Sequence, residues 1–263
     1  MGSLLVKPHK TPTPTKIPYA VMITGANRGL GLQVVKDLLA SNSCHLIATC
    51  RSLGGEGSRE LEELAAKESR LTVLELDVSN PATFSKVAEA VDGIVKENGL
   101  NALVNNAGIH IRKGLEDVTV DDMAQTFATN TIGPLMLTQS FLPLLKRAAS
   151  HASDKPLGWQ RAVVINMSTI LGSISSNDKG GLYPYRSSKA ALNAITKSLS
   201  VDLVKDGIIT CSVHPGWVQT DMGGSNAPVT IEESVQGMLK LFAKLDHNSN
   251  GGFFQYDGSV MNW

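Results

Sequence analysis

Short apolar runs alternate with longer segments of helical periodicity along most of the chain. Seven runs lack a polar and apolar alternation and predict strands, the fourth with its exit turn, at residues 19–24, 45–50, 71–77, 101–108, 161–168, 208–215 and 251–256. Between them, apolar residues at helical spacing predict helices at residues 30–41, 58–69, 81–98, 120–150, 185–205 and 231–245. We expect the helix over 120–150 to bend near Gly133 and Pro134.

This alternation predicts the fold class. Strands that are apolar throughout are typical of a parallel sheet with helices on both faces, and strand–helix alternation gives a doubly wound α/β sheet. No internal repeat and no second composition regime is visible, so one domain is expected over residues 19–263. Residues 1–18 carry prolines and an apolar run too short for a signal peptide, and are expected to form a flexible N-terminal extension.

The charge and cysteine content of the chain indicate which partners and which compartment to expect. The 24 basic and 24 acidic residues among 263 balance to a net charge of zero, which argues against nucleic acid or a membrane surface as a partner. No window approaches the ~20 apolar residues of a membrane span. Cys44, Cys50 and Cys211 lack metal-ligand spacing and are expected to be buried thiols in a reducing compartment. We therefore expect a cytoplasmic protein without a metal site.

The first strand leads into a glycine-rich turn, TGANRGLG, at residues 24–31. Ligands of doubly wound sheets bind beyond the carboxyl ends of the strands, so residues that follow strands are the candidates for a site. Glycines at 25, 29 and 31 would let the backbone approach a pyrophosphate at the helix N-terminus, where unpaired N–H groups favour anions. An ordinary strand–helix turn is the alternative interpretation.

Two arginines indicate which dinucleotide would bind. Enzymes that use NAD place an acidic residue about 20 residues beyond the glycines, where it holds the ribose 2′-hydroxyl. This chain has Arg51 there, after the second strand, and Arg28 within the glycine turn. Arginine binds a 2′-phosphate through charge-assisted hydrogen bonds, so the pair favours NADP(H). Alternatively, both are ordinary solvated surface arginines.

Polar residues also follow the later strands. Asp77 could accept a hydrogen bond from an adenine amine or cap the turn before Pro81, and the sequence leaves both open. Asn130 lies inside a predicted helix, where asparagine is a poor helix former, so a local disruption there would indicate function. Tyr185 and Lys189 stand one helical turn apart on one helix face.

Together, the motifs TGANRGLG, NNAG, Asn130, INMSTILGS, YRSSK and HPGWVQTDMGG resemble those of the short-chain dehydrogenase/reductase family over residues 18–263. In finer detail the chain is similar to the sniffer-type carbonyl reductases, which use NADPH. The resemblance implies a single Rossmann-like domain with a seven-stranded parallel sheet, and hydride transfer between a nicotinamide and a carbonyl or alcohol. It implies the following cofactor-binding residues: Gly25, Asn27, Arg28, Gly29, Leu30, Arg51, Asp77, Val78, Asn106, Ala107, Gly108, Tyr185, Lys189, Pro215, Gly216, Val218 and Thr220.

The resemblance also implies catalytic roles. Tyr185 would be the general acid that protonates the carbonyl oxygen, and Lys189 would lower the pKa of this phenol and hold the nicotinamide ribose. Asn130 would anchor a water that links Lys189 to solvent. Val218 and Thr220 would contact the carboxamide.

One position departs from the family pattern. The catalytic serine is commonly the second of a Ser-Ser pair three residues after an asparagine, and that position here is Thr169, preceded by Ser168. Threonine keeps the hydroxyl but has a more restricted rotamer. We favour Thr169 as the catalytic hydroxyl and keep Ser168 as the alternative.

The expected function is NADPH-dependent reduction of a small carbonyl substrate. The alternatives are an alcohol or steroid-like dehydrogenase and a non-catalytic dinucleotide-binding sensor. Residues 173–184 and 216–228 are expected to border the substrate, with the second segment as a lid. Trp217, Met222 and His110 are candidate pocket residues, although a lone histidine in His110's position is more often a surface or hydrogen-bonded residue than a catalytic one. Small residues of the helix at 185–205 would permit a homodimer.

Overall fold

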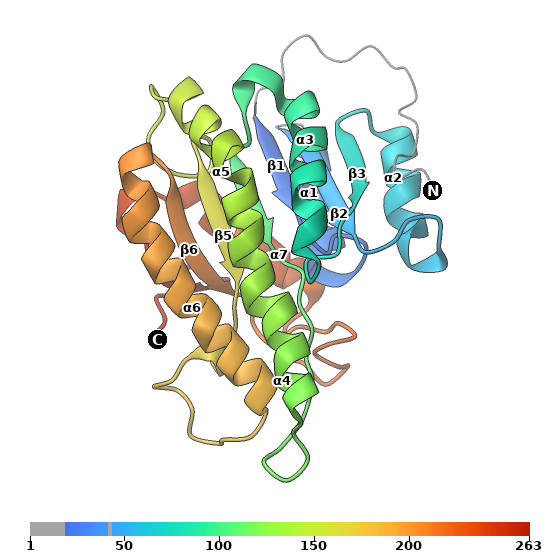
Figure 1. Ribbon diagram of the computed structural model, residues 1–263, viewed down its shortest axis with the longest axis vertical. Coiled ribbons are helices and arrows are strands. Elements are labelled where there is room, and N and C mark those ends of the chain that lie inside the picture. Colours follow the sequence, from blue (N-terminus) through green and yellow to red (C-terminus); the bar gives the residue numbers. More distant parts are fainter. Residues whose placement is uncertain (1–18, 42–43) are drawn as a thin grey trace.

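The computed structural model describes residues 19–41 and 44–263 of the chain, so the extension predicted for residues 1–18 lies outside the described residues (Figure 1). Seven strands form one parallel sheet in the order β3-β2-β1-β4-β5-β6-β7. They are β1 (Ala20–Ile23), β2 (His45–Cys50), β3 (Leu71–Glu75), β4 (Ala102–Asn105), β5 (Val163–Met167), β6 (Ile209–His214) and β7 (Phe253–Gln255). The strand order reverses between β1 and β4, which is where such folds bind their ligands.

Helices cover both faces of the sheet, which confirms the predicted single-domain, Rossmann-like α/β fold. The helices are α1 (Gly29–Ala40), α2 (Arg59–Lys67), α3 (Phe84–Val95), α4 (Val120–Phe127), α5 (Gly133–His151), α6 (Tyr183–Leu203) and α7 (Ile231–Lys244). Figure 1 shows α3, α5 and α6 in front of the sheet, with α7 behind it. Short turns of 3-10 helix, such as η2 (Pro81–Thr83) and η3 (Lys96–Asn98), extend some of these helices to the predicted bounds.

Successive side chains of a strand pack on opposite faces of the sheet, so the hydrophobic core has two layers. In β1, Val21 and Ile23 pack with α1 and α7 on one face, while Ala20 and Met22 pack with α3 and α5 on the other. Successive side chains of a strand point to opposite faces, so an apolar strand can serve two cores at once. The three cysteines are buried and form no disulfide among the described residues, as predicted. None of the helices in the described part of the chain is long and apolar enough to cross a membrane.

The long helix predicted over 120–150 is interrupted around Asn130, the poor helix former noted in the sequence. After α4, residues Ala128–Ile132 form a π-helical turn, η4, and α5 begins at Gly133, next to Pro134. The buried Asn130 lies within η4. The predicted local disruption at Asn130 is therefore confirmed, and such turns are frequent at functional sites, whereas the bend near Gly133 and Pro134 stays a prediction.

Gly133 is required at this position by close packing. A β-carbon on Gly133 would overlap with the carbonyl oxygen of Val78 in the loop after β3. We expect Gly133→Ala to lower the free energy of unfolding by about 1–3 kcal/mol, because inserting an atom into a packed site forces backbone shifts. Gly93→Ala in α3 is the matched control, since a β-carbon there meets no atom within 4 Å.

Urea unfolding followed by circular dichroism measures both variants. The control should be neutral or slightly stabilising, because alanine is the better helix former. Equal stability of Gly133→Ala and the parent protein would contradict the packing argument.

Candidate active site

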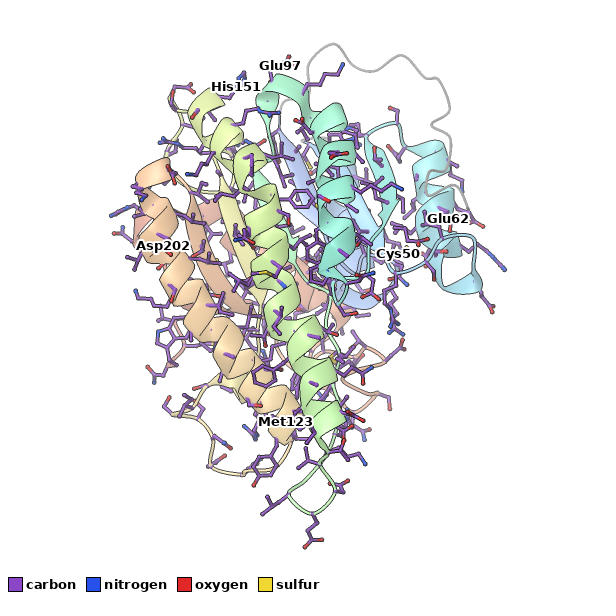
Figure 2. The ribbon with its side chains drawn as sticks, viewed as in Figure 1. Cys50, Glu62, Glu97, Met123, His151 and Asp202 are labelled. Carbon is purple, nitrogen blue, oxygen red and sulfur yellow. The ribbon has the colours of Figure 1, made fainter. Side chains whose placement is uncertain are left out.

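The candidate site lies at the carboxyl ends of the strands, where the glycine turn, η4, the loops after β4, β5 and β6, and the first turns of α6 meet. In Figures 1 and 2 this is the lower end of the molecule, which holds α4 with Met123. Most of the side chains assigned from the sequence gather here. Their hydrogen bonds separate those that can meet a ligand from those that hold the site together.

The glycine turn is held against the NNAG segment after β4. A β-carbon on Gly25 would lie 2.9 Å from the Cα of Ala107, and one on Gly31 would lie 2.6 Å from Nδ2 of Asn106. Nδ2 of Asn106 donates to the carbonyl oxygens of Thr24 (2.8 Å) and Gly25 (3.1 Å). The hydroxyl of Thr24 accepts from the backbone N–H groups of Asn106 and Ala107, at 3.0 Å each. The amide of Asn106 therefore shapes the turn, and Thr24 is a supporting residue that the sequence analysis did not single out.

The N-terminus of α1 fits an anion. Arg28 is its N-cap residue and makes no side-chain cap, and the first turn holds no acidic residue. Gly25 (φ +63°) and Gly29 (φ +53°) have left-handed backbone that favours glycine. Open N–H groups and an approachable backbone are what a pyrophosphate needs.

The two arginines have different surroundings. Arg51 is exposed after β2. Nη1 of Arg28 lies 3.1 Å from Oδ2 of Asp221, and this exposed ion pair joins the glycine turn to the segment after β6. Nδ2 of Asn27 donates to the carbonyl of Gly57 at 2.9 Å, so this amide fastens the loop after Arg51.

Asp77 caps its own turn. Its Oδ1 accepts from the backbone N–H of Ser79 at 2.9 Å and from the Ser79 hydroxyl at 2.7 Å. This arrangement favours the capping interpretation over a contact of that oxygen with adenine. Val78, the next residue, is buried.

Tyr185 and Lys189 are buried side chains on the first turns of α6. Nζ of Lys189 donates to the carbonyl oxygen of Met167 at the end of β5, at 2.6 Å. A β-carbon on Gly172 would lie 2.9 Å from Cβ of Lys189, so the turn η5 (Ile170–Gly172) packs directly on α6. The residues between Met167 and this turn are thereby held next to Lys189.

Burial sets both pKa values. It raises the pKa of Tyr185 to about 12, because the phenolate would lose its water. Burial lowers the pKa of Lys189 to about 8, because the charged ammonium likewise loses its water. Burial is thus the dominant influence on Tyr185, and Nζ of Lys189 donates to the Met167 carbonyl; the lowering of the Tyr185 pKa by Lys189 that the resemblance implies stays a prediction.

Asn130 holds the loop after β4 to α6. Its Oδ1 accepts from the N–H of Ile109, and its Nδ2 donates to the carbonyl of the same residue, both at 2.9 Å. Nδ2 also donates to the Ser188 hydroxyl at 3.1 Å. A β-carbon on Gly108 would lie 3.2 Å from Oδ1 of Asn130 and 3.7 Å from Nζ of Lys189, so both polar atoms flank one small space.

The two hydroxyls after β5 differ in their bonding. Oγ1 of Thr169 accepts from the N–H of Leu171 at 3.3 Å and caps η5. Its hydroxyl hydrogen remains available for donation. Oγ of Ser168 is buried and has no hydrogen-bond partner among the described residues.

The segment after β6 is held in place by a β-bridge and by hydrogen bonds. Val218 pairs with Val229 in an isolated bridge, and Thr220 Oγ1 accepts from the N–H of Gly223 at 3.1 Å. Oγ of Ser234 binds the carbonyl of Pro215 at 2.6 Å. Gly216, at φ +89°, turns the chain between these contacts.

Met222 brings this segment over the phenol. Its Sδ lies 3.9 Å from the Tyr185 hydroxyl, and its carbonyl accepts from Nη2 of Arg112 at 2.7 Å. Met222 therefore lies beside the Tyr185 hydroxyl, and its role as a pocket residue stays a prediction. Trp217 is exposed, and its Nε1 donates to Gly223 within the segment.

His110 lies closer to Tyr185 than its sequence position indicated. Its ring centroid is 4.1 Å from that of Tyr185, with the planes inclined by 32°. Its Nε2 is buried without a hydrogen-bond partner among the described residues. A histidine two residues after NNAG was the available signal, but a single sequence does not place its ring.

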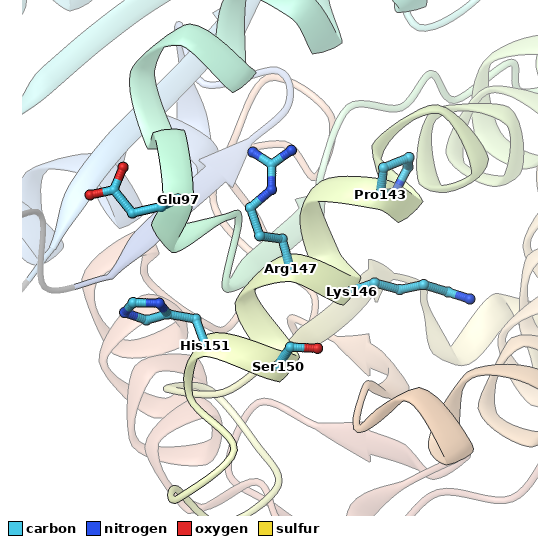
Figure 3. Close-up of a pocket in the computed structure, with 6 residues that line it drawn as sticks. All are labelled: Glu97, Pro143, Lys146, Arg147, Ser150 and His151. Carbon is cyan, nitrogen blue, oxygen red and sulfur yellow. The ribbon is translucent and has the colours of Figure 1, made fainter.

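A surface hollow of about 560 Å³ lies at the other end of the molecule (Figure 3). It is lined by Glu97, Pro143, Lys146, Arg147, Ser150 and His151. Its two cations are already paired, Lys146 with Asp206 and Arg147 with Asp92. Figure 2 shows Glu97 and His151 far from Met123, so this hollow is separate from the Tyr185 site.

Comparison with known proteins gives a consistent picture. The sequence profile of the family described as short chain dehydrogenase matches residues 19–229. The carbonyl reductase Sniffer of D. melanogaster is 46% identical and superimposes with a TM-score of 0.90 over 94% of this chain and 100% of its own. An NADPH-bound carbonyl reductase from chicken fatty liver is 41% identical, with a TM-score of 0.89 and the same coverage. C-signal of Myxococcus xanthus is 41% identical over 165 residues, which is 62% of this chain and 93% of that protein.

Proposed function

This chain belongs to the short-chain dehydrogenase family, and we propose that it reduces carbonyl compounds (aldehydes, ketones or quinones) to alcohols with NADPH. The observation that carries the proposal is the buried Tyr185 and Lys189 pair on α6 at the ligand-binding edge of the sheet, where Lys189 binds the Met167 carbonyl and Asn130 binds Ser188 of the same helix. The likeness to two carbonyl reductases above 40% identity over nearly the whole chain supports the same reaction class.

NADPH would supply the hydride. The glycine turn and the N-terminus of α1 would hold its pyrophosphate, and Val218 and Thr220 would contact its carboxamide. Arg51 and Arg28 would bind the 2′-phosphate, for which Arg51 is the better placed because Arg28 already pairs with Asp221. Lys189 would hold the nicotinamide ribose.

The Tyr185 hydroxyl would donate its proton to the carbonyl oxygen as the carbon is reduced. Because burial raises the pKa of Tyr185 to about 12, the phenol is protonated at neutral pH and has a proton to donate. The Lys189 ammonium would stabilise the phenolate that remains after the transfer. A non-catalytic dinucleotide sensor would have no use for this buried acid.

Asn130 and Gly108 would maintain the proton supply. The space between Oδ1 of Asn130 and Nζ of Lys189 is kept open because residue 108 lacks a side chain. A water there would link the ammonium to solvent and restore the Tyr185 proton.

We assign the substrate-facing hydroxyl to Thr169. Its oxygen already accepts a hydrogen bond from Leu171, which leaves the hydroxyl hydrogen to bind the carbonyl oxygen. Thr169→Ala should lower kcat/KM for carbonyl reduction about 10- to 100-fold, the range for a hydrogen bond of 1.5–3 kcal/mol that is made to a charged group.

Thr169→Ser and Ser168→Ala are the matched controls. The first keeps the hydroxyl and should retain most of the activity, and the second should have a small effect. A large loss in Ser168→Ala with little change in Thr169→Ala, measured by steady-state kinetics, would assign the role to Ser168.

A turnover screen tests the function itself. The purified chain should oxidise NADPH, followed by its absorbance, in the presence of aldehydes, ketones or quinones. Binding of NADPH without turnover of any member of the panel would favour a sensor instead.

We also propose a cytoplasmic location, because the three cysteines are buried and form no disulfide among the described residues. The small or exposed side chains of Ala190, Ala194 and Val201 on α6 would allow a homodimer to form through that helix.

A further inference from the structure

His110 is a polar side chain beside Tyr185 for which the proposed mechanism has no role. It lies in the loop after β4, and its half-buried ring packs against the phenol with 4.1 Å between centroids. This contact places an imidazole next to the group that would protonate the substrate.

The backbone on both sides of His110 is fixed. Asn130 binds both the N–H and the carbonyl of Ile109, each at 2.9 Å. Two residues further on, Nη2 of Arg112 donates to the Met222 carbonyl at 2.7 Å. His110 is therefore held by a supported loop, which is the arrangement expected of a preorganised binding group.

The ring nitrogen of His110 lacks the partner that buried polar atoms normally have. Its Nε2 is buried without a hydrogen bond among the described residues, although burying an unpaired polar atom destabilises the fold. His45 is a useful contrast, because its Nε2 lies 3.1 Å from the Thr72 hydroxyl. Burial, with a smaller contribution from the charge of Arg112, also lowers the pKa of His110 to about 4. The ring is thus neutral at pH 7 and offers one N–H donor.

We propose that Nε2 of His110 donates a hydrogen bond to a second polar atom of the substrate and so positions the carbonyl at the Tyr185 hydroxyl. The preferred substrates would be carbonyl compounds with an oxygen or nitrogen acceptor on the atom next to the carbonyl carbon. This inference rests on the proposed function. Met222, whose Sδ lies 3.9 Å from the Tyr185 hydroxyl, would move aside for such a substrate, and the methionine side chain is flexible enough to do so.

Two isomeric aldehydes test the inference. Picolinaldehyde carries its ring nitrogen next to the carbon that bears the aldehyde, whereas isonicotinaldehyde carries it on the opposite side of the ring. His110→Phe keeps an aromatic ring against Tyr185 but removes the donor. It should lower kcat/KM for picolinaldehyde about tenfold, as expected for one lost hydrogen bond, and leave isonicotinaldehyde nearly unchanged.

His110→Asn and His151→Phe complete the experiment. The first restores a side-chain N–H and should recover part of the preference for picolinaldehyde. The second changes an exposed histidine at the far end of the molecule, which Figure 2 labels, and should alter neither rate. Melting temperatures show whether each variant folds. If His110→Phe is unstable, the rates of His110→Asn with the two aldehydes are compared with those of the parent protein instead.

The possible outcomes separate the inference from the function. Equal losses for both aldehydes, no loss for either, or failure of both His110 variants to fold would overturn the role of His110. Absence of NADPH-dependent reduction of both aldehydes by the parent protein would instead overturn the proposed function.

Discussion

Tyr185→Phe is expected to lower kcat for carbonyl reduction about a thousandfold, within the range that a positioned general acid contributes. The variant removes one oxygen from a buried side chain and leaves the ring that packs against His110. The hydroxyl makes no hydrogen bond among the described residues except a 3.9 Å contact with Met222 Sδ, so its loss should hardly change stability. Single-turnover kinetics at saturating NADPH measures the effect on the chemical step.

Tyr183→Phe is the matched control for this variant. It removes the same atom from an exposed tyrosine two residues earlier in α6, and should lower turnover far less than Tyr185→Phe does. The affinity for NADPH should be similar in both variants. Carbonyl reduction by Tyr185→Phe at the rate of the parent protein would remove the phenol from the mechanism.

Arg51→Asp is expected to weaken NADPH binding about a hundredfold, because it replaces a charge-assisted hydrogen bond to the 2′-phosphate with repulsion. Binding of NADH should be nearly unchanged or improved, since the aspartate could accept a hydrogen bond from the ribose 2′-hydroxyl. Arg51 is exposed and lies beyond the core, so the fold should tolerate the change. Fluorescence titration with each dinucleotide measures both affinities.

Lys205→Asp provides the control for charge. It makes the same change of two units on an exposed residue after α6, at the opposite edge of the sheet, and should affect both dinucleotides little. Equal losses of NADPH and NADH affinity in Arg51→Asp would show that Arg51 supports the loop rather than the 2′-phosphate.

The strands and helices could be predicted because their signals are local. A strand that is buried on both faces has apolar residues at every position, without polar residues between them. The adjacent residues Val21 and Met22 are an example, because they pack on opposite faces of the sheet and both are apolar. The break at Asn130 was also predictable, because asparagine opposes helix formation within its own turn.

The interactions that organise the site depend on contacts between distant segments. The Arg28–Asp221 ion pair joins residues 193 positions apart, and nothing near either residue specifies the other. Burial determines the pKa of Tyr185, and a helix pattern alone does not reveal how completely a phenol is covered. For the same reason the sequence indicated that Tyr185 and Lys189 share a face, but not that Nζ of Lys189 would bind the Met167 carbonyl.

Supporting roles were harder to predict than the positions of residues. The amide of Asn106, implied as a cofactor contact, holds the glycine turn. Asp77 was left open between adenine and its own turn, and its Oδ1 caps that turn. Amides and carboxylates at strand ends can serve the backbone or a ligand equally well, so only geometry distinguishes the two uses. His110 shows the reverse case, because its unpaired nitrogen becomes visible only once the loop is folded.

Transfer of deuterium from labelled NADPH tests the central claim most directly. Parent protein is incubated with a carbonyl substrate and NADPH labelled at one or the other face of nicotinamide C4, and the alcohol is analysed by mass spectrometry. We predict deuterium on the former carbonyl carbon from one labelled face only, at a rate that depends on Tyr185. An alcohol without deuterium from either face, or no alcohol at all, would contradict the assignment of this site to carbonyl reduction.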